Sequence, residues 1–222
     1  MSLIIILSFC IIGFGLYLAF PIRQKGTIAY LLAIGSIVNA PIFNCIDFPF
    51  KVFGVSIGLD SVVYFLFIFT MLLTHAYCGK KQALDLMLTS IAAVLFAALI
   101  QFLSRWASQG LTKDLGFAML KFIATSISSL GCGLVLFKLY DILKAKGVNL
   151  YLNASICLIV AGIVENIIFY GALIVFGYVD LSVVLSLLGG LYLGKAIGLV
   201  FALATIFISQ KYKKDEKIPY NS

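Results

Sequence analysis

Charged side chains are scarce in this chain of 222 residues. Only 11% of the residues are charged and 63% are hydrophobic, whereas about a quarter of the residues in a typical soluble domain are charged. No polar stretch is long enough to form a separate soluble domain, and a membrane span needs roughly 20 apolar residues. The composition therefore excludes a water-soluble globular protein and predicts a single integral membrane domain over residues 1–222.

The sequence also lacks the residue patterns that carry catalysis or bind metals. It has one histidine, five cysteines without C-x-x-C or metal-ligand spacing, and no phosphate-binding loop, nucleophile elbow or H-E-x-x-H motif. We therefore expect neither an enzyme nor a metal or cofactor site. The net charge of +7 does not indicate a nucleic-acid partner, because the basic residues lie in short loops between apolar runs.

Seven apolar segments are long enough to cross a bilayer, and charged or turn-forming residues separate them. They cover residues 3–20, 27–44, 60–79, 83–103, 115–139, 151–179 and 181–209. The first has neither a basic leader nor a cleavage pattern, so we expect a retained span rather than a signal peptide. The sequence thus predicts an all-α, polytopic transmembrane helix bundle of about seven spans in contact with the lipid bilayer.

Lysine and arginine are concentrated in alternate loops. The richer set comprises Arg23, Lys25, Lys80, Lys81, Lys144, Lys146, Lys211, Lys213, Lys214 and Lys217. The opposite set comprises Lys51, Arg105 and Lys113. Because basic loops stay in the cytoplasm, this distribution predicts an outside N-terminus and a cytoplasmic C-terminus, in agreement with an odd number of spans.

A glutamate and a lysine lie in the middle of the last two predicted spans. The segment GIVENIIFYG, residues 162–171, places Glu165 and Asn166 in apolar surroundings, where an ionisable side chain is costly unless it is paired, hydrated or neutral. Glu165 lies fifteen residues before the turn at Asp180, and Lys195 lies fifteen residues after it. Both are about 22 Å from the turn at the helical rise, so we predict that they pair at equal depth in an antiparallel hairpin.

Glycines surround Lys195, and two interpretations of the pair remain open. Gly190, Gly194 and Gly198 recur every fourth residue, which is typical of close helix packing, and Gly189–Gly190 is expected to weaken the helix. In one interpretation Glu165 and Lys195 form a buried structural ion pair. In the other they line a polar cavity near the midplane, where transporters place substrate sites beside interrupted helices.

Four parts of the chain resemble a known family in their order and spacing. They are VNAPIFN (38–44), GVSIGLDSVVYFLFIFTMLLTHAYCGKKQAL (54–84), LKFIATSISSLGCGLVLFKLYDILK (120–144), and GIVENIIFYGALIVFG followed by LYLGKAIGLVFALATIF. Together they resemble the vitamin-uptake transporter (VUT) family, whose studied members transport queuosine precursors. The resemblance implies a six-span core at 27–210, an extra N-terminal span and loop at 1–26, a basic cytoplasmic tail at 211–222, and a location in the cytoplasmic (inner) membrane of a prokaryote.

The chain departs from the family at its acidic positions. An acidic pair near the end of the long apolar helix corresponds here to Leu72 and Ala76, with Thr70, Thr74 and His75 as the polar residues nearby. An aspartate of the penultimate helix corresponds to Asn166, with Glu165 alongside.

The resemblance implies uptake of a small planar solute, most specifically a 7-deazaguanine nucleobase. A carboxylate can accept hydrogen bonds from the adjacent N–H groups of such a base, and an amide or ammonium can donate to its carbonyl. The candidate substrate-binding residues are Glu165, Asn166, Lys195, Asn39, Asn44, Thr70, Thr74, Phe169 and Tyr192. For either threonine the alternative is a hydrogen bond to its own helix, and for the aromatic residues it is core or lipid packing.

A second function remains open beside transport. The missing acids and the extra first span favour a substrate-binding membrane subunit or sensor that acts with a partner protein, similar to the substrate-binding components of vitamin-uptake systems. With either function, the chain could also form a homo-oligomer. Uptake by this chain alone and binding with a partner predict different results in a reconstituted membrane.

Overall fold

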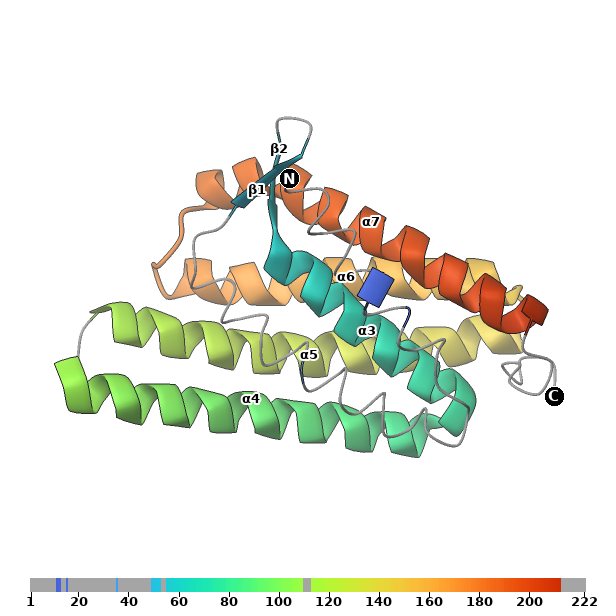
Figure 1. The fold of residues 1–222 in the computed structure, drawn as a ribbon, viewed down its shortest axis with the longest axis horizontal. Coiled ribbons are helices and arrows are strands. Elements are labelled where there is room, and N and C mark those ends of the chain that lie inside the picture. The colour runs from blue at the N-terminus through green and yellow to red at the C-terminus, as the bar shows by residue number, and fades with distance from the viewer. Residues whose placement is uncertain are drawn as a thin grey trace.

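The computed structural model describes residues 49–52, 55–109 and 113–212, together with the isolated helical residues 11, 12, 15 and 35. The elements are β1 (Pro49–Val52), β2 (Val55–Gly58), α3 (Leu59–Cys78), α4 (Lys80–Gln109), α5 (Lys113–Ala145), α6 (Leu150–Val175) and α7 (Leu181–Tyr212) (Figure 1). Apart from those isolated residues, the predicted spans 3–20 and 27–44 lie outside the described residues.

Each of the five helices is long and apolar enough to cross a membrane. They correspond to the last five predicted spans, which confirms the helical class and the order of these elements. Helices α4 and α5 extend to Gln109 and Ala145, beyond the predicted ends at 103 and 139. The helices continue there through polar residues, which a count of apolar residues leaves out.

A glycine with positive φ follows three of the helices, and Gly79 after α3 is the first. Gly147 follows α5 with φ +72°, and Gly177 follows α6 with φ +70°. At the turn after α6 the N–H of Tyr178 donates to the carbonyl of Leu173 at 3.0 Å, which is the long hydrogen bond of a Schellman motif. Because residues other than glycine rarely adopt a positive φ, these positions fix where α5 and α6 stop.

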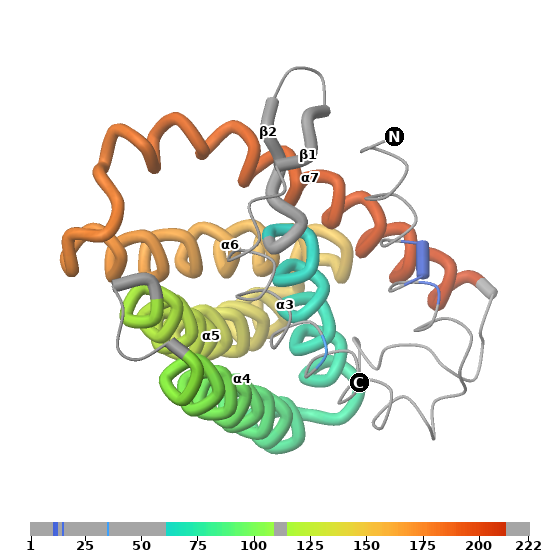
Figure 2. Tube along the Cα trace, turned by 60° about the vertical axis from the view of Figure 1, so that its left-hand side comes forward, coloured from blue at the N-terminus to red at the C-terminus, as the bar shows by residue number. Residues whose placement is uncertain are grey.

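Helix α3 occupies the centre of the bundle and contacts each of the other four helices (Figure 2). In its membrane-spanning part, 83% of the residues are buried, against 28% in α4. Phe65, Phe67 and Phe69 are among its largest fully buried side chains. Leu72 is also fully buried and Ala76 packs against the same core, so both of these positions lie in apolar packing.

The outer faces of the helices carry large apolar side chains. On α4 these include Phe96, which is 65% exposed, and on α6 Ile167, which is 66% exposed. Buried charge and exposed hydrocarbon are the reverse of a soluble bundle, and such surfaces are compatible with contact to lipid.

A small hairpin precedes α3 and adds two short strands to the predicted helix bundle. β1 and β2 pair antiparallel, with Pro49 opposite Gly58 and Val52 opposite Val55. Strand β2 contacts α7. The sequence PFKV–FG–VSIG does carry a hairpin signal, because two short runs with β-branched residues are separated by two residues that include a glycine.

Candidate functional site

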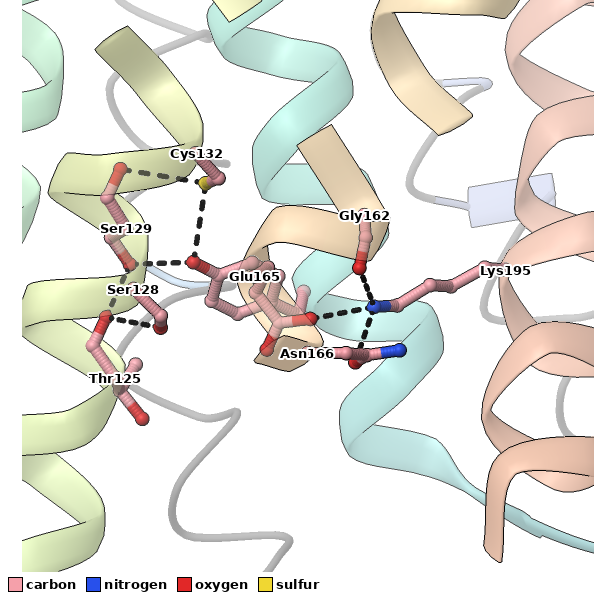
Figure 3. Close-up of polar contacts among 9 residues, drawn as sticks. Thr125, Ser128, Ser129, Cys132, Gly162, Glu165, Asn166 and Lys195 are labelled. Atoms are coloured by element: carbon pink, nitrogen blue, oxygen red, sulfur yellow. Dashed lines mark hydrogen bonds and ion pairs between the residues drawn. The ribbon is translucent and has the colours of Figure 1, made fainter. Parts of the chain in front are cut away.

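The side chains of Glu165 and Lys195 meet in the interior of the bundle, as predicted (Figure 3). Lys195 Nζ donates to Glu165 Oε2 at 2.6 Å, to Asn166 Oδ1 at 2.7 Å and to the carbonyl oxygen of Gly162 at 2.7 Å. Lys195, Glu165 and Asn166 are all buried. An ammonium group has three N–H donors, so every donor of Lys195 has an acceptor.

Helix α6 supplies all three acceptors from one face. Gly162, Glu165 and Asn166 stand at positions i, i+3 and i+4, which lie next to each other on a helix surface. A Cβ atom at Gly162 would lie 3.3 Å from Lys195 Cδ, so the glycine leaves room for the lysine stem to cross the helix. Gly162 was not among the predicted site residues, although its spacing from Glu165 and Asn166 is a signal for a shared face.

Gly198 of α7 serves packing against α3, as one of the two interpretations states for the glycines. Gly190, Gly194 and Gly198 are buried, and a Cβ atom at Gly198 would lie 2.6 Å from Cδ1 of Phe65 on α3. The expected weakness at Gly189–Gly190 is not a break, because α7 is continuous from Leu181 to Tyr212. In a membrane a broken helix would expose unpaired backbone groups, which favours an unbroken one.

A cavity of about 170 Å³ lies beside the lysine, between α3, α6 and α7. Its lining consists of Phe65, Leu158, Ile159, Gly162, Tyr192, Lys195, Ala196 and Leu199. The lining includes Lys195 but neither Glu165 nor Asn166, so the cavity is apolar and aromatic, and Lys195 is the one charged residue in its wall. An engineered cavity of about 150 Å³ accepts benzene, so this one has room for a molecule of about that size.

A buried hydroxyl cluster borders Glu165 on the side opposite Lys195 (Figure 3). The hydroxyl of Tyr64 on α3 lies 2.8 Å from Ser129 Oγ and 3.6 Å from Cys132 Sγ, both on α5. Ser129 Oγ in turn donates to the carbonyl of Thr125 at 2.6 Å. Glu165 is close enough to interact electrostatically with Tyr64 and Cys132. The glutamate therefore lies between a cation and a polar cluster.

The two predicted threonines bond to their own helix. Thr70 Oγ1 donates to the carbonyl of Leu66, and Thr74 Oγ1 donates to the carbonyl of Thr70, each at 2.8 Å. Neither threonine lines the cavity beside Lys195. The structure thus agrees with the alternative given for them, that of back-bonded helix residues.

The remaining predicted residues fall in different places. Tyr192 lines the cavity and is partly exposed. Phe169 is buried in a separate cluster, where its ring packs edge-on against Tyr170 at 5.1 Å. Asn39 and Asn44 lie outside the described residues.

Two further observations bear on ligands. Asn166 Nδ2 is buried and has no hydrogen-bond partner among the described residues, so it is a free donor beside the ion pair. Within the same part of the chain, no group of three or more His, Cys, Asp or Glu residues is placed to hold a metal ion.

No protein-family model, curated protein or solved structure matches this chain.

Proposed function

We propose that the protein is a membrane transporter that takes up a small planar solute, and that the solute binds in the cavity beside Lys195. The observation that carries this proposal is that the buried residue Lys195 lines an otherwise apolar cavity. An ionisable side chain within a membrane span is costly and marks a functional site by default. A purely structural pair would not need a cavity at its side.

The lysine and the glutamate take different roles in this proposal. Lys195 borders the cavity and Glu165 does not, so the lysine contacts the solute and the glutamate neutralises the lysine. Gly162, whose carbonyl accepts a hydrogen bond from Lys195 Nζ, is the one of the three partner residues that also borders the cavity. A solute carbonyl could replace the Gly162 carbonyl at low cost, because a helical carbonyl keeps its own backbone N–H partner.

The aromatic lining favours a planar solute. Phe65 on α3 and Tyr192 on α7 both border the cavity. Stacking of a base on an aromatic side chain contributes about 1–3 kcal/mol. A 7-deazaguanine queuosine precursor combines a planar ring with a carbonyl acceptor, and this identification rests on the resemblance to the VUT family, of which the chain would be a divergent member.

The proposed topology has seven spans, with the N-terminus outside and the C-terminus in the cytoplasm of a prokaryote. Its support is the position of the lysines on the described helices. Lys80 and Lys81 begin α4, Lys144 and Lys146 lie around the end of α5, and Lys211 lies at the end of α7. These positions all fall at one end of the antiparallel bundle, which is the pattern of a cytoplasmic surface.

Uptake by purified protein in liposomes tests the proposal. We expect a labelled 7-deazaguanine base to accumulate with the unmodified chain and with Ile167→Ala, a change on the exposed face of α6. Lys195→Met should abolish uptake, and Tyr192→Ala should weaken it more than Tyr192→Phe does. Normal uptake by a correctly inserted Lys195→Met protein would refute the assigned site.

Binding without uptake would identify the second function. Thermal stabilisation in detergent by 7-deazaguanines, other nucleobases or vitamins reports binding, because a ligand stabilises the state to which it binds. A chain that is stabilised by one of these compounds but never transports it would be a substrate-binding subunit or sensor. Stabilisation that is lost in Lys195→Met would still place the ligand at the same site.

A further inference from the structure

A second buried ionisable side chain lies near the end of α3. Nε2 of His75 lies 2.7 Å from Oδ1 of Asp141 on α5. The side chain of His75 is 4% exposed, whereas that of Asp141 is 50% exposed. The pair therefore joins a carboxylate that solvent reaches to an imidazole that lies inside the bundle.

The ring of His75 is held in one place by aromatic contacts. The centre of the His75 ring lies 5.1 Å from that of Phe137 and 5.3 Å from that of Tyr140, and the Tyr140 ring stands at 76° to it. The other ring nitrogen, Nδ1, is buried and has no hydrogen-bond partner among the described residues. Buried polar atoms of this kind are uncommon and call for an explanation.

The titratable groups around the pair come from α5 and α6. Tyr140 and Asp141 of α5 contact the ring, and Lys144 follows Asp141 by about one turn of the same helix. Cys157 of α6 is close enough to interact electrostatically with Asp141. Asp141 is the one carboxylate among these groups, so it is the natural proton partner of the imidazole.

We propose that His75 and Asp141 form a proton-exchange site, which carries a proton between the solvent at this end of the bundle and its interior. In the outward direction Nδ1 takes a proton from a protonated water on the interior side, the water is left neutral, and the ring becomes an imidazolium. The Nε2–H bond then breaks as an O–H bond forms on Asp141, and the carboxyl group releases that proton to water. The ring is left as the other neutral tautomer. Movement of its remaining proton from Nδ1 to Nε2 through water resets the ring without undoing the transfer, and the inward direction runs the same steps in reverse.

Both nitrogens are needed for this step, which separates it from a structural link. A hydrogen bond that only joins α3 to α5 would use Nε2 and leave Nδ1 buried without purpose. A relay uses the solvated carboxylate, the ring and the buried nitrogen together. Coupling of this proton to solute movement rests on the proposed function; the exchange itself does not.

Nuclear magnetic resonance can follow the ring directly, because His75 is the one histidine of the chain. In full-length protein with ¹⁵N-labelled histidine, both nitrogen signals should move together as the pH is lowered and the imidazolium forms. Proton exchange with water should slow about 100-fold in Asp141→Asn, because a positioned acid–base group contributes at least that factor.

Asp85→Asn is the matched control, since Asp85 is an exposed carboxylate in the early part of α4 at the same end of the bundle. It should leave the exchange rate unchanged. Equal exchange rates in Asp141→Asn and the unmodified chain would overturn the proposal. The proposal would also be overturned if the His75 ring of the unmodified chain keeps one neutral tautomer at every pH measured. This second test needs no variant.

Liposomes with a pH gradient then test the coupling to solute. We expect His75→Gln to keep exchange of labelled solute for unlabelled solute but to lose accumulation driven by the gradient. Unchanged accumulation would refute the coupling. If the unmodified chain moves no solute at all, the proposed function fails, and the nuclear magnetic resonance result still decides whether the proton site exists.

Discussion

Replacing the members of the Glu165–Lys195 pair separately and together should give unequal losses of stability. Lys195→Met leaves the carboxylate of Glu165 buried without a cation, and such a break costs about 3–5 kcal/mol. Glu165→Gln keeps an oxygen acceptor for Nζ but removes its charge, so we expect about 3 kcal/mol, the lower end of that range. The double variant removes both charges and should lose only about 1–2 kcal/mol, the cost of a buried amide that lacks a partner.

Unfolding of the variants in detergent micelles, followed by circular dichroism, measures these free energies. Ile167→Ala is the matched control on α6, because its side chain is 66% exposed and its loss should cost about 0.5 kcal/mol or less. The expected result is a double variant more stable than either single variant. If the losses of the single variants simply add in the double variant, the two side chains do not interact, and the reasoning from their contact is refuted.

Two other changes test the helix packing and the start of α6, and thermal unfolding measures both. Gly198→Ala places a Cβ atom 2.6 Å from the ring of Phe65, so it should cost about 1–3 kcal/mol of stability. Phe65→Leu in the same chain should recover part of this loss, and equal stability of Gly198→Ala and the unmodified chain would contradict the contact. Asn149 caps α6 by accepting from the N–H of Leu152 at 2.9 Å, so Asn149→Ala should cost about 1 kcal/mol while Asn149→Asp should not. Equal effects of the two Asn149 changes would contradict the cap.

Span positions and the ion pair could be predicted because both depend on regular geometry. The thickness of a bilayer fixes the length of an apolar helix, which placed the five described helices. The constant rise per residue then put Glu165 and Lys195 at one depth by counting from Asp180. Neither step needs knowledge of side-chain packing, and both hold for neighbouring helices joined by a short turn.

Contacts between helices that are distant in the sequence could not be obtained by counting. His75 and Asp141 lie on α3 and α5, with α4 between them in the chain, so their pairing depends on where α3 lies in the bundle. The cavity beside Lys195 likewise depends on Phe65 from α3. The bonds of Thr70 and Thr74 to their own helix, by contrast, are local, and the sequence could offer them as the alternative to ligand contact.

Charge balance around Lys195 limits the solutes that the proposed site can accept. Glu165 already supplies one negative charge to the ammonium, so the pair is neutral and buried. A solute carboxylate would bring a second negative charge to one cation in a medium of low dielectric constant, where like charges repel strongly. A neutral carbonyl would replace only the carbonyl of Gly162 and leave the Glu165 bond intact. The arrangement therefore favours neutral planar solutes over carboxylates, and an anionic solute would bind only together with a proton on Glu165.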